Sequence, residues 1–133
     1  MSTVIRSKLS RKNRFYIDKN RYYELKYFCL QYDDWKRALT DIQNTIRTLP
    51  EVYVQQSTVA DVTAKMADAR MYYQNRIDLI ENAAKETSSD FWKYLVQAVT
   101  KGYTYNALDI PCCREVYYEM YREFFWRLSM TRN

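Results

Sequence analysis

The stretch SDFWKYLVQAVTKGYTYNALDIPCCREVYYEMYREFFWRL, residues 89–128, decides the fold. Its first part, 89–101, has apolar residues at helical spacing and ends at Gly102, the only glycine of the chain. A second helical pattern runs from about Cys112 to Leu128, and Pro111 suits the first position of that helix because its missing N–H is not needed there. A helix, a tight segment and a second helix form the outline of a helix-turn-helix, whose second helix enters the major groove of DNA.

The last helix is expected to have two faces. The core stripe, spaced by three or four residues, consists of Cys113, Tyr117, Met120, Phe124 and Leu128. The adjoining face carries Arg114, Tyr118, Tyr121, Arg122 and Phe125. Arginine reads guanine edges or binds phosphate, and a tyrosine hydroxyl donates to phosphate, so this face fits a recognition helix.

The rest of the chain also predicts helices. With one glycine and two prolines in 133 residues, we expect an all-α fold of one domain. Helices over about 19–32 and 33–49 should form a helical hairpin (18–49), with Asp18 capping the first and Asp33 or Asp34 capping the second. Residues 50–60 are the expected linker.

A long central helix is expected over 61–86, so that residues 61–133 comprise this helix and the helix-turn-helix-like region. Its apolar residues nearly follow a heptad pattern. We favour packing of this stripe on the first hairpin, and the alternative is the surface of a homodimer.

The basic residues gather at the N-terminus. The net charge is +5, and residues 1–26 hold eight Lys or Arg against Asp18 and Glu24. Residues 1–17 therefore form a basic arm, in which Arg11, Lys12 and Arg14 are candidates for phosphate contacts. The alternative is a solvated tail.

Several classes of function lack their residues. The chain has no histidine, the commonest general base and metal ligand, and no phosphate-binding glycine loop. We expect no enzyme, no cofactor and no metal site. Three cysteines without a C-x-x-C pair favour a reducing cytoplasm, and no apolar run is long enough to span a membrane.

Two stretches carry a resemblance to a known family. They are Arg11-Lys12-Asn13 with Tyr22–Tyr32 and Trp35-Lys36, and Ala98–Gly102 with Asp109–Arg114, Tyr117-Tyr118, Tyr121-Arg122 and Phe124-Phe125. Together they resemble small proteins of Gram-positive prophages that look like distant relatives of phage late-gene transcriptional regulators with a sigma-factor region-4-like helix-turn-helix. The resemblance covers most of the chain outside the linker.

This resemblance implies a DNA-binding transcriptional regulator in the bacterial cytoplasm, with double-stranded DNA and host RNA polymerase as partners. The implied DNA-facing residues are Arg114, Tyr117, Tyr118 and Arg122. The sequence departs from the pattern in the short segment Tyr105–Asp109 and in Glu123, which stands where a basic residue is expected. The alternative function is inhibition of a host protein, such as a nucleic-acid-guided defence nuclease, by direct protein binding, which the many tyrosines and tryptophans also suit.

Overall fold

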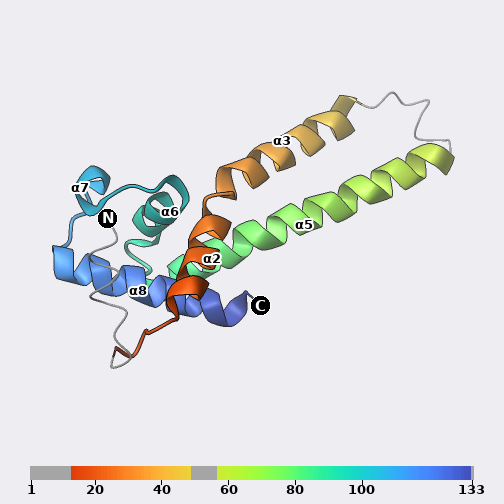
Figure 1. The fold of residues 1–133 in the computed structure, drawn as a ribbon. Coiled ribbons are helices and arrows are strands. Elements are labelled where there is room, and N and C mark those ends of the chain that lie inside the picture. Colours follow the sequence, from red (N-terminus) through yellow and green to blue (C-terminus); the bar gives the residue numbers. More distant parts are fainter. Residues whose placement is uncertain (1–12, 49–56, 133) are drawn as a thin grey trace. The chain divides into compact units, whose positions relative to one another are not determined.

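The computed structural model describes residues 13–48 and 57–132, and every regular element within these ranges is a helix (Figure 1). The helices are α2 (Lys19–Cys29), α3 (Tyr32–Thr48), α5 (Ser57–Thr87), α6 (Trp92–Lys101), α7 (Tyr105–Leu108) and α8 (Arg114–Thr131). The all-α prediction is confirmed.

The helices are divided between two compact units. The first contains α2, the part of α5 from Leu79 onward, and α6, α7 and α8, and the second contains α3 and α5 up to Asp78. One boundary therefore falls between Gln31 and Tyr32, which separates the two helices that the sequence placed in one hairpin. The hairpin over 18–49 stays a prediction.

The ends of α2 and α3 differ from the predicted ones. Asp18 occupies the N-cap position of α2, but its carboxylate accepts a hydrogen bond from the Tyr16 hydroxyl (2.8 Å) and caps no backbone N–H. α2 ends at Cys29 because its last turn tightens, and the Gln31 N–H bonds the Phe28 carbonyl three residues back. α3 then begins at Tyr32, so Asp33 and Asp34 lie within its first turn. A carboxylate at this end of a helix interacts favourably with the helix dipole.

The long helix is longer than predicted at its start. α5 begins at Ser57, so residues 57–60 of the expected linker are helical, and residues 49–56 lie outside the described residues. After α5, the Ser88 hydroxyl accepts a hydrogen bond from the Phe91 N–H (3.0 Å) and stabilises a turn. α6 therefore begins at Trp92, three residues later than the expected start at residue 89. Gly102 ends α6 in the left-handed conformation, with φ of 71°, as its place in the sequence predicted.

α8 is the centre of the first unit. α2 packs against α6 and α8, and α6 also packs against α7 and α8. The most deeply buried side chains come from α2, the later part of α5, α6 and α8. Those with no exposed surface are Leu25, Cys29, Ile80, Ala84, Leu95, Phe124 and Leu128. On α8 the expected core stripe is buried from Tyr117 to Leu128, whereas Cys113, predicted to belong to it, is exposed.

An aromatic seam joins α2 to α8. Its rings are Tyr22, Tyr121 and Phe125, with Phe125 edge-on to each tyrosine at a centroid distance of 5.0 Å. The Tyr22 and Tyr121 hydroxyls lie 2.9 Å apart and hydrogen-bond each other. Each hydroxyl thus gives the other a partner inside an apolar contact, which removes the penalty of burying it alone.

Two further contacts hold the ends of this unit. The Arg21 guanidinium of α2 donates to the Ser129 carbonyl (3.1 Å) and to the Arg132 carbonyl at the end of α8. A cation at this position satisfies carbonyls that the helix leaves unpaired. The Phe15 ring packs on Trp126 at 5.4 Å, so the segment just before α2 is also attached to α8.

The burial of α8 predicts how two substitutions on it will differ. Phe124→Ala should lower the free energy of unfolding by about 3–5 kcal/mol, because Phe124 has no exposed surface and its removal leaves a cavity. Val116→Ala, on the same helix but 46% exposed, should change it by less than about 0.5 kcal/mol. Urea unfolding followed by circular dichroism measures both. Equal effects would contradict this assignment of the core.

Candidate nucleic-acid interface

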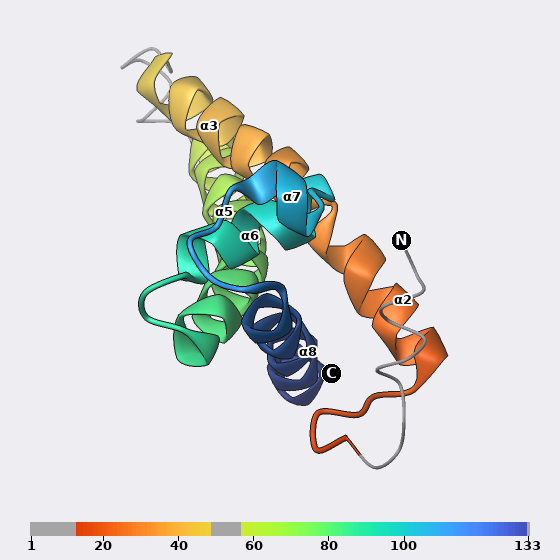
Figure 2. The same cartoon turned by 90° about the vertical axis from the view of Figure 1, so that its left-hand side faces the viewer.

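The chain between α6 and α8 is ordered by local contacts that place the start of α8. The Thr104 side chain caps α7 by accepting the Ala107 N–H (3.2 Å), and Asp109 ends α7 in the left-handed conformation, with φ of 55°. Ile110 is buried and anchors the segment that follows. Figure 2 shows α7 beside α6, with the chain then running to the first turn of α8.

α8 begins later than expected. The sequence predicted a start at Pro111 or Cys112, but the helix starts at Arg114 with Cys113 in an extended N-cap conformation. The Tyr105 hydroxyl of α7 donates to the Cys112 carbonyl, just before the helix begins. Pro111 therefore belongs to the turn, and Cys113 lies at the exposed end of the helix and not in the core.

Arg114 is exposed and is held by α7. Its guanidinium carbon lies 4.9 Å from the centre of the Tyr105 ring, and its Nη2 donates to the Asn106 side chain at 3.3 Å. These interactions restrict the side chain without burying it. Arg114 is thus a cation fixed at the N-terminal turn of α8, where recognition helices contact bases.

Tyr118 lies half-buried beside Arg114. Its ring is 6.4 Å from Tyr105 and 5.0 Å from Tyr117, measured between centroids. Arg114 and Tyr118 are four residues apart on α8 and therefore share one face of the helix. Tyr105, a residue that was not among those predicted for the site, contacts both of them. Its spacing gave no sign of this, since the arrangement depends on the path of the chain from α7 to α8.

Tyr117, in contrast, belongs to the core. The sequence predicted it both for the core stripe and for the implied DNA-facing set, and its side chain is 2% exposed. Burial raises the pKa of its hydroxyl, and the neighbouring Tyr118 and Tyr22 hydroxyls raise the pKa further. A residue this buried has no surface to offer to DNA, so we remove it from the candidate set.

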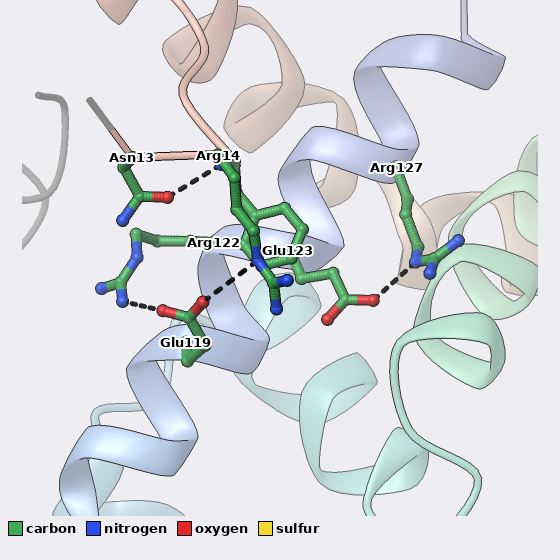
Figure 3. Close-up of polar contacts among 7 residues, drawn as sticks. Asn13, Arg14, Glu119, Arg122, Glu123 and Arg127 are labelled. Atoms are coloured by element: carbon green, nitrogen blue, oxygen red, sulfur yellow. Dashed lines mark hydrogen bonds and ion pairs between the residues drawn. The ribbon is translucent and has the colours of Figure 1, made fainter. Parts of the chain in front are cut away.

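Arg122 is also largely buried, with 12% of its side chain exposed. It forms an ion pair with Glu119, one turn earlier on α8, and Glu119 lies 4.0 Å from the exposed Arg14 (Figure 3). Arg127 pairs in the same manner with Glu123 at 2.8 Å. Side chains three residues apart on a helix can pair, so the spacing of Glu119 and Arg122 could have indicated this interaction from the sequence.

The charge of the two units is balanced apart from the N-terminal residues. Residues 79–133 hold seven acidic and seven basic side chains, and residues 32–48 with 57–78 hold six of each. α8 itself carries three arginines and three glutamates. The positive charge of the protein thus comes from residues 1–26, of which Arg11 and Lys12 lie outside the described residues.

The described residues contain no candidate metal site and no candidate membrane-spanning helix. Among residues 13–48 and 57–132, the side chains of histidine, cysteine, aspartate and glutamate form no group of three that could hold a metal ion. In the same ranges no helix combines the length and the apolar character needed to cross a membrane.

Comparison with known proteins does not assign the chain to a family. Neither a protein-family model, nor a curated protein, nor a solved structure matches it. The resemblance to phage regulators therefore remains an expectation from the quoted residues.

The buried tyrosines predict a loss of stability at high pH. Burial raises the pKa of Tyr22, Tyr117 and Tyr121 above that of the unfolded chain, which is about 10. The unfolded chain then loses these protons first, so the free energy of unfolding should fall as the pH rises above about 10. Urea unfolding over a pH series, with tyrosinate absorbance to follow ionisation, measures this effect. In a Tyr117→Phe variant the fall should be smaller, and an identical pH profile would contradict the burial of Tyr117.

Proposed function

We propose that this chain is a phage-type DNA-binding transcriptional regulator that offers the N-terminal part of α8 to the major groove of duplex DNA. The observation that carries the proposal is the placement of Arg114. It is exposed at the first turn of a helix that α6 braces, and Tyr105 and Asn106 hold it there. A restricted arginine at this position loses less entropy when it binds a guanine edge or a phosphate.

The electrostatic attraction comes from the N-terminal residues. Residues 1–12 contain four basic side chains and no acidic ones, and Phe15 attaches the chain just after them to Trp126 of α8. The arm is therefore tethered on the helix that we propose to bind DNA. Since α8 is neutral by itself, the arm supplies the phosphate contacts that give most of the affinity for any sequence.

The proposed contact set is smaller than the predicted one. It retains Arg114 and Tyr118 on α8 and Arg11, Lys12 and Arg14 in the arm, and it omits the buried Tyr117. Arg122 is largely buried and paired with Glu119, so it contacts DNA only where a phosphate replaces that glutamate. Host RNA polymerase is a proposed further partner, and the bacterial cytoplasm is the proposed place of action. Both follow from the likeness to phage regulators.

Exposed apolar side chains favour a second candidate function. Tyr27, Leu30 and Met130 lie exposed on the first unit, and such residues suit a protein partner. The second candidate is therefore a phage-encoded inhibitor that binds a host protein directly. The two functions separate on one measurement, since a protein without salt-dependent affinity for duplex DNA leaves only the second.

Replacement of Arg114 tests the base-reading part of the proposal. Arg114→Ala should weaken binding to the preferred duplex by about 1–3 kcal/mol and leave the free energy of unfolding nearly unchanged, because the side chain is exposed. Fluorescence anisotropy with labelled duplexes selected from a random pool measures the affinity. Lys101→Ala is the control and should have little effect on affinity, because this exposed cation lies at the C-terminal end of α6 and not on α8. Equal reductions in the two variants would contradict a specific contact by Arg114.

Deletion of residues 1–12 tests the arm. The shortened chain keeps Phe15 and Arg21, so their interactions with α8 remain. Affinity should fall for all duplexes alike, and the slope of log K against log salt should decrease by about 0.9 for each phosphate that the arm neutralises in the full chain. Binding titrations at several salt concentrations measure both. An unchanged slope would make the arm a solvated tail.

A further inference from the structure

We propose that Glu119 occupies an anion site formed by Arg14 and Arg122, and that a phosphate group of DNA takes its place when the protein binds. This inference rests on the proposed DNA-binding function and deepens it, because it names a residue that limits the affinity.

The geometry of the site is that of one carboxylate between two guanidinium groups. Glu119 Oε2 lies 4.0 Å from Arg14 Nε, and Glu119 Oε1 accepts a hydrogen bond from Arg122 Nη2 (Figure 3). Arg122 follows Glu119 by three residues on α8, and Arg14 comes from the turn that precedes α2. Two parts of the chain far apart in sequence thus direct cations at the same acidic group.

The carboxylate does not satisfy this pair of cations. Two positive charges meet one negative charge, and Arg122 Nε and Nη1 are buried without an acceptor among the described residues. A buried N–H without a partner is unfavourable, because it has lost its hydrogen bond to water and gained none in return. A phosphate group offers more oxygen acceptors than a carboxylate and pairs well with arginine, so it suits Arg14 and the Arg122 Nη2 that now bonds Glu119.

The interaction with Arg14 is also easy to give up. Arg14 is 77% exposed and Glu119 is 40% exposed, and their distance is at the long end for an ion pair. Exposed pairs of this kind contribute little to stability. Loss of the Arg14 interaction therefore costs the fold little, and a phosphate that replaces Glu119 gives Arg122 a new partner. While Glu119 stays in place, it competes with DNA for both arginines.

The same helix provides a matched control. Glu123 pairs with Arg127 at 2.8 Å, and within the described residues no second cation shares its carboxylate. Glu119→Gln and Glu123→Gln change the same residue type on one helix and raise the net charge equally. A difference between them reports the site at Glu119 and not the total charge.

The experiment measures duplex affinity against salt for the full chain and for both variants. Glu119→Gln should bind DNA about tenfold more tightly than the parent and should steepen the slope of log K against log salt by about 0.9, the value for one additional phosphate. Glu123→Gln should remain within about twofold of the parent. Addition of Arg14→Ala to Glu119→Gln should remove most of the increase in affinity.

The other outcomes are distinguishable. If the parent binds DNA and the two glutamine variants behave alike, the role of Glu119 is overturned while the proposed function stands. If neither the parent nor the variants bind duplex DNA, both fail. Inorganic phosphate serves as a second probe, read out by thermal unfolding. Stabilisation of Glu119→Gln by phosphate without an increase in DNA affinity would assign the site to a small phosphate ligand and overturn its role in DNA binding.

Discussion

The burial of α8 is the constraint on which the rest of this structure depends. Its side chains from Tyr117 to Leu128 fill the core of the first unit, and the aromatic seam with Tyr22 fixes α2 against it. A helix that supplies a core over most of its length can offer a ligand only its ends and the side chains outside its buried face. Its most exposed side chains lie at its two ends, with Arg114 and Val116 in the first turn and Met130 in the last.

This constraint decides how the charges of α8 are used. Arg122 and Arg127 lie where the helix is partly covered, and each has a glutamate one turn before it. A guanidinium so close to a core requires a partner, because burying a charge that has no partner is strongly unfavourable. Glu119 and Glu123 are thus structural partners of these arginines. In the sequence alone, their negative charge argues against DNA binding. They reduce the positive potential of α8, and residues 1–26 are left to provide it.

The sequence predicted the helices better than it predicted the site. Apolar spacing located α5, α6 and α8, and Gly102 marked the end of α6, because these signals act within a few residues. The start of α8 was placed too early, since the hydrogen bond from Tyr105 to the Cys112 carbonyl lies outside any local propensity. The same limit applies to the interface. The resemblance implied Arg114, Tyr117, Tyr118 and Arg122 as one DNA-facing set, whereas the apolar spacing placed Tyr117 in the core stripe. The burial of Tyr117 agrees with the spacing, and Arg114 is exposed.

The separation of an exposed helix end from a buried helix body also bears on the choice between DNA and a protein partner. A recognition helix reads bases mainly with its N-terminal residues, so burial of the remainder of α8 is compatible with that role. The tight segment through α7 fits this arrangement, because Tyr105 and Asn106 support Arg114 with a single helical turn where a longer helix would be expected. A protein partner would instead use exposed apolar side chains such as Tyr27 and Met130. Binding through these side chains would not require Arg114 to be held in place. The order imposed on Arg114 by α7 is therefore the feature that favours DNA.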